Sequence, residues 1–375
     1  MKAVMVTTFP LEPDCIVGGV GGVSVYLTRE LARIEGLSLE VIAFDSPVLA
    51  ERTRDFEGVP VHYLPRAVGC GPIVRRVWAT PAAVKRKLCE LDFDLVHVQA
   101  VARIAQVLDC PRVLTIHGIP ERDQLFRRWG RLRSLFVKTV ERPARRRIGN
   151  VIVISPYVRT ALAGQLRGRT WDIENPVADH FFDVQRRPVP GRVLFGGLIV
   201  PRKNILGLLR AFAIVASDDP QTELRLAGHG ADSAYGRQCL HLASRLGVAE
   251  RVRFLGPLPV EELKKEMAQA WSLVLCSFQE TAPVIIEEAM AVGVPVVASN
   301  ICGIPYMVAD GQTGVLVNPA DPADIARGLL SVLQAEDAEA MSARSRQIAN
   351  ERFRASVVAH KTYEVYQQVL LDSRP

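Results

Sequence analysis

The 375-residue chain combines 49% hydrophobic with 23% charged residues, a composition that excludes a disordered or fibrous protein. A single hydrophobic core rarely grows to this length, so we expect two domains. The net charge is +6, and the excess lies in residues 1–185, which hold 26 Lys and Arg against 20 Asp and Glu. This asymmetry indicates an anionic partner or surface for the first domain. The excess is modest and no recognition motif accompanies it, so a nucleic-acid partner is excluded.

The apolar runs and the cysteines indicate where the protein resides. No apolar run reaches the roughly 20 residues that a membrane-spanning helix requires, and strand-like sequence begins at Lys2. The 7 cysteines are scattered and form no C-x-x-C pair, which argues against a disulfide framework and against a zinc site. We therefore expect a cytoplasmic protein without a metal site.

Short apolar, β-branched runs alternate with longer amphipathic stretches, a pattern typical of parallel sheets with crossover helices. The strands expected in the first half begin at Lys2, Leu39, Val59, Asp94, Arg112 and Val151. Those expected in the second half begin at Arg192, Glu223, Arg251, Ser272, Pro295 and Gly314. The pattern predicts an α/β protein of two doubly wound, Rossmann-like domains, whose ligands would bind beyond the carboxyl ends of the strands.

A stretch rich in proline and charge, residues 174–191, is expected to link the domains. The first domain then spans residues 1–180 and the second residues 186–355. The final residues, 356–375, have the three- and four-residue apolar spacing of a helix. This helix either packs on the second domain or crosses back to the first.

The strongest chemical signal is a pair of carboxylates eight residues apart, Glu280 and Glu288. Pro283 fits the first turn of a helix, so Glu280 would lie in the loop before that helix and Glu288 within it. Carboxylates accept hydrogen bonds from vicinal hydroxyls, while a helix N-terminus attracts phosphate. The pair therefore suits a sugar joined to a diphosphate. A buried structural carboxylate followed by an ordinary solvated Glu is the alternative.

The segment around this pair resembles the E-x7-E motif of the retaining family 4 glycosyltransferases of the GT-B fold. Residues 303–317, GIPYMVADGQTGVLV, resemble further elements of that family, although Cys302 stands in place of a family glycine. The resemblance implies two domains facing a central cleft, the first binding the acceptor and the second the nucleotide-sugar donor. It implies that Glu280 contacts hydroxyls of the donor sugar and Glu288 its ribose. The intervening donor contacts would come from Thr281, Ala282 and Val284.

A second signal is a basic pair, Arg202 and Lys203, at the end of the strand expected from Arg192. Two cations at this position can neutralise a diphosphate and stabilise it as a leaving group. The residues PRKN resemble one of two versions of the family motif, and Leu198 takes the place of the arginine of the other version. Arg202 is therefore the candidate for the diphosphate. An exposed basic pair at a helix start is the alternative.

A glycine-rich stretch precedes the helix expected after the first strand; its glycines are Gly18, Gly19, Gly21 and Gly22. Glycines there would let backbone N–H groups approach a phosphate or a sugar closely. Ser24 stands where a dinucleotide-binding fingerprint requires glycine, and the loop after Thr8 is long, which argues against NAD. The resemblance assigns these glycines to the wall between donor and acceptor.

Two histidines stand at expected strand ends. The resemblance implies that His117 contacts the donor sugar, and a role in packing or turn geometry is the alternative. For His97 we expect a structural or acceptor-side role. Gly228, in the sequence LAGHG, matches a further family element and is expected at the donor site, whereas Ser155 and Asn175 match the family with less chemical content.

Residues 121–147 carry ten Lys and Arg against three acids. Apolar residues recur at helical spacing within this segment: Leu125, Trp129, Leu132, Phe136 and Val140. A basic amphipathic helix can lie on an anionic membrane surface, which would suit a lipid-linked acceptor. A stripe that faces the core, with a solvated basic face, is the alternative.

These features predict a glycosyltransferase that moves a sugar from a UDP- or GDP-linked donor to a glycan or lipid-linked hydroxyl acceptor, in the synthesis of cell-surface polysaccharide or glycolipid. Retention of configuration is implied by the resemblance. No Asp-x-Asp pair is suited to hold a metal, so we expect no metal or cofactor, with Arg202 and Lys203 acting on the leaving group. A nucleotide-sugar epimerase of the same fold and a non-catalytic nucleotide- or glycan-binding protein are the alternatives.

Overall fold

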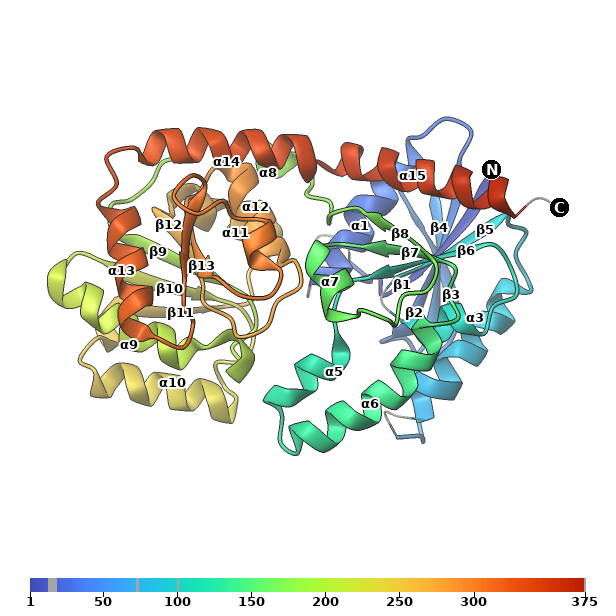
Figure 1. Ribbon diagram of the computed structural model, residues 1–375, viewed down its shortest axis with the longest axis horizontal. Coiled ribbons are helices and arrows are strands. Elements are labelled where there is room, and N and C mark those ends of the chain that lie inside the picture. Colours follow the sequence, from blue (N-terminus) through green and yellow to red (C-terminus); the bar gives the residue numbers. More distant parts are fainter. Residues whose placement is uncertain (13–18, 72–73, 100, 374–375) are drawn as a thin grey trace. The chain divides into compact units, whose positions relative to one another are not determined.

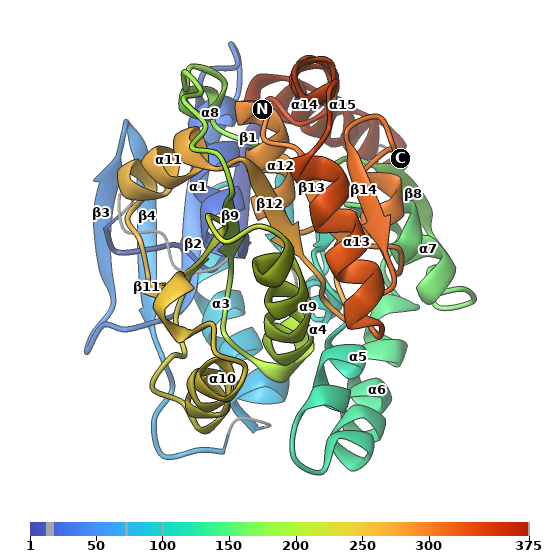
Figure 2. The same ribbon diagram turned by 90° about the vertical axis from the view of Figure 1, so that its left-hand side faces the viewer.

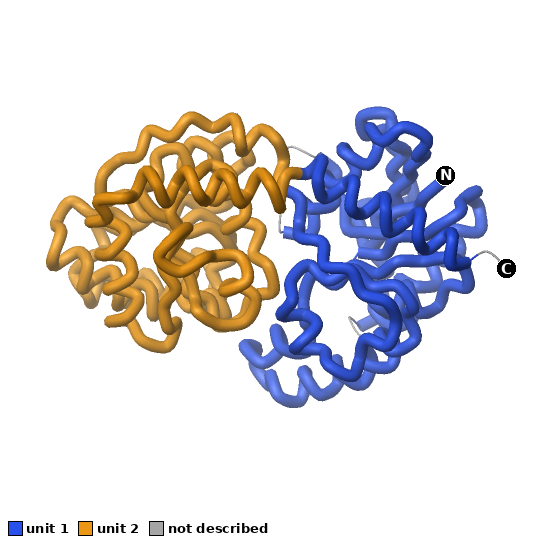
Figure 3. The backbone as a smooth tube through the Cα atoms, turned by 45° about the horizontal axis from the view of Figure 1, so that its top comes forward, with its two compact units in different colours: residues 1–176, 355–375 blue, residues 177–354 orange. Residues whose placement is uncertain are grey.

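The computed structural model describes residues 1–12, 19–71, 74–99 and 101–373 (Figure 1). Two compact units make up the chain (Figure 3): residues 1–176 together with 355–375, and residues 177–354. The C-terminal helix α15 (Ala355–Asp372) thus belongs to the first unit, which confirms that it crosses back rather than packing on the second domain. Among the described residues, no helix has both the length and the hydropathy to cross a bilayer.

In the described residues, the first unit is built on an eight-stranded sheet with the order β3-β4-β2-β1-β5-β6-β7-β8. Its strands are β1 (Lys2–Thr7), β2 (Ser38–Ser46), β3 (Arg52–Phe56), β4 (Val59–Pro65), β5 (Leu95–Gln99), β6 (Arg112–Ile116), β7 (Asn150–Val153) and β8 (Arg169–Asp172). The six strands expected from apolar runs are all present, and their side chains are largely buried.

The sequence pattern predicts neither of the two edge strands of this sheet. β3 is antiparallel to β4, so the sheet is mixed rather than purely parallel. The two strands join through Glu57 and Gly58, both with positive φ (52° and 86°), as a tight hairpin requires. β3 is exposed except at Phe56, and the four residues of β8 are exposed or half-buried, so neither strand shows a buried apolar run.

Helices and helical turns cover this sheet. They are α1 (Gly19–Ala32), η1 (Arg75–Ala79), α3 (Thr80–Leu88), α4 (Ala102–Gln106), α5 (Pro120–Asp123), η2 (Gln124–Phe126), α6 (Gly130–Arg145) and α7 (Pro156–Ala161). α15 packs against α1, and a buried hydrogen bond of 2.7 Å joins the Tyr366 hydroxyl of α15 to Nδ1 of His97 in β5. Nε2 of His97 lies 2.6 Å from Oγ1 of Thr115 in β6. Of the two roles expected for His97, the structural one is therefore observed.

In the described residues, the second unit contains a parallel six-stranded sheet with the order β11-β10-β9-β12-β13-β14. Its strands are β9 (Arg192–Gly196), β10 (Glu223–Ala227), β11 (Val252–Gly256), β12 (Ser272–Leu275), β13 (Val296–Ser299) and β14 (Gly314–Val317). All six were expected from the sequence. The chain runs outward from β9 to β10 and β11, then returns to the other side of β9 at β12. The strand order therefore reverses between β9 and β12.

The helices and turns of the second unit are α8 (Asp179–Phe182), η3 (Pro201–Lys203), α9 (Ile205–Asp218), α10 (Ala234–Arg245), η4 (Ala249–Arg251), α11 (Val260–Gln269), α12 (Val284–Val292), η5 (Ile304–Tyr306), α13 (Pro322–Leu333) and α14 (Ala338–Arg352). α9 and α13 pack side by side (Figure 2). The expected linker is not an irregular spacer throughout. It contains α8, whose Phe181 and Phe182 are buried, and the backbone N–H of Val177 donates to the Phe353 carbonyl at 2.7 Å.

Candidate functional site

The loops after β9 and β12 lie side by side at the carboxyl edge of the second sheet. β9 and β12 pair in parallel, with Ser272 opposite Val193. The N–H of Phe278, after β12, donates to the carbonyl of Arg202, after β9, at 2.9 Å. Open α/β sheets bind ligands where the strand order reverses, so these two loops form the expected place for a site in this unit.

Three of the expected site residues meet between these loops. Nη1 of Arg202 and Nζ of Lys203 lie 2.8 and 2.7 Å from the same carboxylate oxygen, Oε1 of Glu280. Arg202 and Lys203 occupy the short turn η3, and Asn204, with φ of 58°, turns the chain from η3 into α9. The Arg202 guanidinium also donates to the carbonyl of Gln279. Lys203 is buried, so the pair is not the exposed basic pair of the alternative interpretation.

The electrostatics of this cluster favour an ionised Glu280. Burial would by itself raise the pKa of Glu280, but the charges of Lys203 and then of Arg202 outweigh burial and hold the pKa below its usual value. Two cations around one carboxylate leave a net positive charge, which suits a diphosphate. Both cations approach Oε1, so Oε2 is the oxygen better placed to accept a hydrogen bond from a hydroxyl.

Glu288 has a different environment. Pro283 precedes α12, so Glu280 lies in the loop before the helix and Glu288 within it, as the sequence indicated. Glu287 and Glu288 are both buried, so the interpretation of Glu288 as an ordinary solvated residue is wrong. Burial raises the pKa of Glu288 to about 8. Thr281 and Ala282 are buried in the loop, and Val284 begins α12.

Glycines allow neighbouring loops of this edge to touch. Gly228, after β10, has φ of 148°, and a Cβ there would lie 1.8 Å from the carbonyl oxygen of Gly197. A Cβ at Gly303 would lie 1.6 Å from the carbonyl oxygen of Thr281. The close approach of the chain to itself thus accounts for glycine at 228, and a donor contact there stays a prediction. Cys302 has φ of 60°, a conformation that glycine adopts more readily.

His117 lies in the first unit, just beyond the end of β6. Its Nδ1 is 3.2 Å from Oδ1 of Asn175, and its Nε2 is hydrogen-bonded to the side-chain amide of Gln99. Burial lowers the pKa of His117 to about 4 although the bond to Asn175 opposes the shift. The ring is therefore neutral at physiological pH and carries one N–H, which one of the two amide oxygens accepts. The other amide can bond to the bare ring nitrogen only with its NH2 group turned toward the ring. Both ring nitrogens are engaged, and a contact with a sugar would have to replace one of these bonds.

Gln99 was missed by the sequence reasoning. It ends β5 and pairs in register with Thr115 of β6, two residues before His117. Its position as a polar residue at the end of the buried run LVHVQ was the available signal.

The expectation for the glycine-rich stretch requires a correction. Gly18 lies outside the described residues, and α1 begins at Gly19, so Gly19, Gly21 and Gly22 lie in the first turn of the helix rather than in a loop before it. Within the described part of the chain, a Cβ at Gly21 would have no atom within 4 Å. Contacts of these glycines with a donor stay a prediction.

The structure therefore brings Arg202, Lys203 and Glu280 into contact and places Glu288 on the helix that follows. His117 and the three described glycines belong to the first unit. No group of three or more His, Cys, Asp or Glu side chains that could hold a metal ion occurs among the described residues.

Models of known protein families match both units. The model of glycosyl transferases group 1 matches residues 178–352, and that of glycosyltransferase family 4 matches residues 17–180. A D-inositol 3-phosphate glycosyltransferase of Streptomyces scabiei is 35% identical over 189 residues, which are 48% of this chain and 42% of that protein. The protein of the same name from Geodermatophilus obscurus is 42% identical over 147 residues, 38% of this chain and 33% of that protein. The matched part thus spans less than half the length of these curated relatives.

Solved structures share the fold at low sequence identity. The sucrose-phosphate synthase of Thermosynechococcus elongatus aligns over 100% of both chains with a TM-score of 0.84 and 20% identity. Anabaena HepE, solved in complex with UDP and glucose, aligns over 98% of this chain and 100% of its own with a TM-score of 0.75 and 21% identity. Because the two family matches together run from residue 17 to residue 352 and the solved structures share the fold, the chain belongs to the family 4 glycosyltransferases of the GT-B fold.

Proposed function

We propose that the chain transfers a sugar from a nucleotide-diphosphate sugar to a hydroxyl acceptor with retention of configuration and without a metal ion. The observation that carries the proposal is the cluster of Arg202, Lys203 and Glu280 at the point where the strand order reverses. Cations for a diphosphate and an ionised carboxylate for sugar hydroxyls occur there within hydrogen-bonding distance of one another.

In the proposed reaction, the bond between the anomeric carbon and the diphosphate oxygen breaks, and its electron pair leaves with the nucleotide diphosphate. Arg202 and Lys203 stabilise the charge that develops on the leaving oxygen. The acceptor oxygen then bonds to the anomeric carbon on the same face, and its proton passes to the diphosphate. Glu280 orients the sugar through its hydroxyls, and Glu288 accepts a hydrogen bond from the ribose. Gly228 completes the donor site of the second unit in this proposal, and contacts of His117 and of the glycines of α1 with the donor stay predictions.

The relatives and the structural neighbours guide the choice of donor. The curated relatives are D-inositol 3-phosphate glycosyltransferases, and HepE was solved with UDP and glucose. UDP-sugars are therefore the first donors to test and GDP-sugars the second. The place of the reaction in cell-surface polysaccharide or glycolipid synthesis belongs to the same proposal.

A donor panel tests the proposal. The full chain is incubated with UDP- and GDP-sugars, and the melting temperature identifies the donor that stabilises it most. That donor is then supplied with candidate acceptors in the presence of a chelator, and the glycoside and the nucleotide diphosphate are measured together. The proposal requires that both products form in equal amounts. Stabilisation by none of the donors would contradict it.

The same assay separates the two alternative functions. A nucleotide-sugar epimerase would consume the donor without an added acceptor, whereas a transferase requires the acceptor. A binding protein would be stabilised by the nucleotide sugar but would form no product with any acceptor. Transfer that depends on the acceptor and disappears in Glu280→Gln excludes both.

The proposal includes a contact between α6 and an anionic membrane surface. Large apolar side chains of this region are exposed, Trp129 at 67% and Leu135 at 62%. The alternative interpretation, an apolar stripe that faces the core, is therefore wrong for these residues. Ten basic residues in the segment 121–147 would attract anionic lipids. Sedimentation with anionic but not with neutral liposomes at low salt is the expected result. Failure to sediment with anionic liposomes would remove this part of the proposal.

A further inference from the structure

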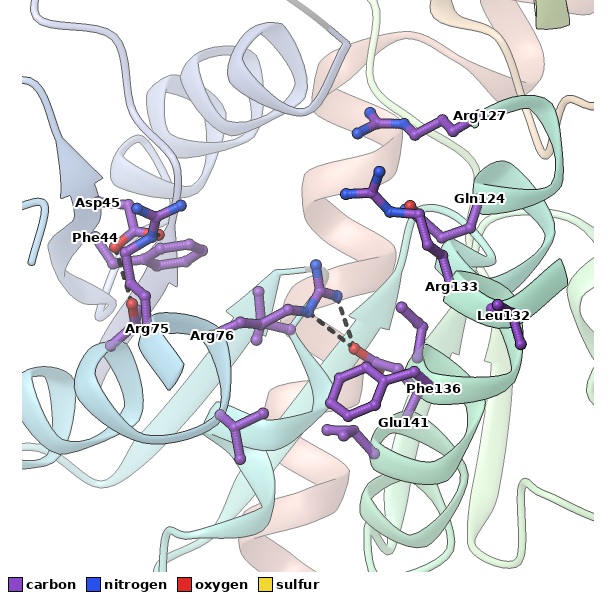
Figure 4. A pocket seen from close by; sticks show the side chains of 15 residues that line it. Phe44, Asp45, Arg75, Arg76, Gln124, Arg127, Leu132, Arg133, Phe136 and Glu141 are labelled. Atoms are coloured by element: carbon purple, nitrogen blue, oxygen red, sulfur yellow. Dashed lines mark hydrogen bonds and ion pairs between the residues drawn. The ribbon is translucent and has the colours of Figure 1, made fainter. Parts of the chain in front are cut away.

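A cavity of about 510 Å³ opens within the first unit between η1 and α3 on one side and α6 on the other (Figure 4). Phe44 and Asp45 at the end of β2 line it, as does Val101, which follows β5. The cavity therefore lies at the carboxyl edge of the first sheet, where an open α/β sheet binds its ligand. No pattern in the sequence predicts this cavity, because its walls come from segments far apart in the chain.

The cavity combines an apolar lining with four arginines. Its apolar side chains are Phe44, Val77, Val101, Leu132, Phe136, Val137 and Val140. Its charged side chains are Arg75, Arg76, Arg127, Arg133, Asp45 and Glu141. Four cations against two acids leave an excess of two positive charges, which would attract a doubly charged anion such as a phosphate monoester.

Two of these arginines are held by the protein itself. Nη2 of Arg76 lies 2.7 Å from Oε1 of Glu141, which is almost completely buried, and Nε of Arg75 lies 3.7 Å from Oδ2 of Asp45. Glu141 in turn lies near the buried Arg145, which pairs with Glu121 at 2.6 Å. This network fixes the wall formed by η1.

The other two arginines have no such partner. Among the described residues, neither Arg127 nor Arg133 forms an ion pair or a hydrogen bond through its guanidinium. In Figure 4 both side chains extend from the wall that contains α6 toward the cavity. Two uncompensated guanidinium groups at the mouth of an apolar cavity are suited to a phosphate whose ester group is hydrophobic.

The apolar surface continues outside the cavity. Leu132 and Phe136 line it and are still 65% and 42% exposed, and Trp78 of η1 is 65% exposed. Patches of this kind on a monomer mark interaction sites. A polar phosphate such as a sugar or polyol phosphate would leave this surface uncovered, whereas an alkyl chain would cover it.

From this combination we infer that the cavity binds an amphiphilic phosphate, with the phosphate on Arg127 and Arg133 and the hydrocarbon chain along Leu132, Phe136 and Val140. The inference rests on the proposed function in one respect, because it makes this ligand the lipid-linked acceptor of the transferase. Binding of the amphiphile itself does not require the donor.

The probe is octyl phosphate below its micelle concentration, titrated calorimetrically into the full chain. Octanol, inorganic phosphate and inositol 1-phosphate are the comparison ligands. Octanol lacks the phosphate that the arginines would bind, and inorganic phosphate and inositol 1-phosphate lack the alkyl chain. We therefore expect octyl phosphate to bind at least about tenfold more tightly than each of the three. Equal affinity for octanol or for inositol 1-phosphate, or no binding of octyl phosphate, would overturn the inference.

Matched variants locate the site. Arg127→Gln/Arg133→Gln should weaken octyl phosphate binding at least about tenfold. The control variant Arg131→Gln/Arg142→Gln also removes two positive charges, but from residues of α6 that do not line the cavity. Its affinity for octyl phosphate should stay within about twofold of the wild type. An equal loss in both variants would overturn the inference in favour of unspecific attraction. Donor binding, measured in the same samples, should be unchanged in both, so that a failure of the proposed function is recognised separately.

Discussion

The ammonium of Lys203 lies 2.7 Å from Oε1 of Glu280, and both residues are more than nine-tenths buried. This contact joins the loop after β9 to the loop after β12, two strands that are neighbours in space but 80 residues apart in the chain if counted from Arg192 to Ser272. The buried charges compensate each other before any ligand arrives. A diphosphate that binds to Lys203 would draw on a cation that is already positioned, and Glu280 would keep its orientation through the same contact.

Replacing Glu280 by Gln should separate binding from transfer. We expect sugar transfer to fall by at least about 100-fold, because the variant loses the ionised group that orients the donor sugar. Binding of the nucleoside diphosphate should persist, since Arg202 and Lys203 no longer share their charge with a carboxylate. Steady-state kinetics and calorimetric titration measure the two effects.

A control is required because Glu280→Gln leaves a buried lysine with a weaker partner, at a cost in the free energy of unfolding of about 3 kcal/mol. Glu266→Gln removes another ion pair of the second unit, that with Arg225 at 2.6 Å, away from the site residues. Transfer should be unaffected in this variant at a temperature where both variants are folded. Wild-type transfer by Glu280→Gln would contradict the assignment of the site.

Glu288 should make the free energy of unfolding depend on pH. Its pKa is about 8 in the folded protein against 4.5 for an ordinary Glu, so between these values the unfolded chain has lost the proton that the folded chain keeps. The neutral Glu288 carboxyl makes its full contribution to the free energy of unfolding below pH 4.5. This contribution is lost as the pH rises through 8. The wild type should lose up to about 1.4 kcal/mol per pH unit relative to Glu288→Gln in this window. Urea unfolding of both proteins from pH 5 to 9 measures this difference, and parallel profiles would show that Glu288 is not buried as described.

Much of the fold could be predicted because burial leaves a pattern in the sequence. Strands such as β1, in which AVMV at 3–6 is buried on both faces, read as continuous apolar runs. The edge strand at 52–56 has one neighbour and exposed side chains, so its residues RTRDF resemble a loop. The start of α12 was predictable from Pro283, since proline favours the beginning of a helix.

The candidate site was predictable only in part. Glu280, Glu288 and the basic pair could be found because each lies within a short sequence motif. Such a motif is visible when residues that act together are also close in the sequence. The pairing of Gln99 with His117 depends on the register of β5 and β6, and the cavity beside α6 depends on the packing of distant segments. Such relationships leave no periodicity in the sequence. The amphipathic pattern of 121–147 was recognised, but Trp129 (φ 60°) interrupts the helix, and the pattern did not specify which surface covers the apolar side chains.

The buried contact between α15 and β5 should contribute to the stability of the first unit. Tyr366→Phe removes the hydroxyl that bonds to Nδ1 of His97 and leaves a buried nitrogen without that partner. We expect a loss of about 1 to 3 kcal/mol in the free energy of unfolding. Tyr363→Phe, a half-buried position on the same helix, serves as the control and should change it by less than about 0.5 kcal/mol. Equal stabilities of the two variants would show that the bond contributes nothing.

Gly228 should not tolerate a side chain. A Cβ there would lie 1.8 Å from the carbonyl oxygen of Gly197, so Gly228→Ala must displace the loop that leads to Arg202. We expect a loss of stability above about 3 kcal/mol together with weaker nucleotide binding. At Gly247, which also has a positive φ (71°), a Cβ would have no atom of the described chain within 4 Å. Gly247→Ala should therefore cost only about 1 kcal/mol and leave nucleotide binding unchanged.

The central claim is that the second unit binds the diphosphate of a nucleotide sugar through Arg202 and Lys203. The most direct measurement compares the affinity of wild type and Arg202→Gln for UDP, for UMP and for uridine, with the corresponding guanine series in parallel. We predict that the variant binds the diphosphate of the preferred base at least about tenfold more weakly and binds the nucleoside as well as the wild type does. Unchanged diphosphate affinity in the variant, or an equal loss for the nucleoside, would contradict the claim.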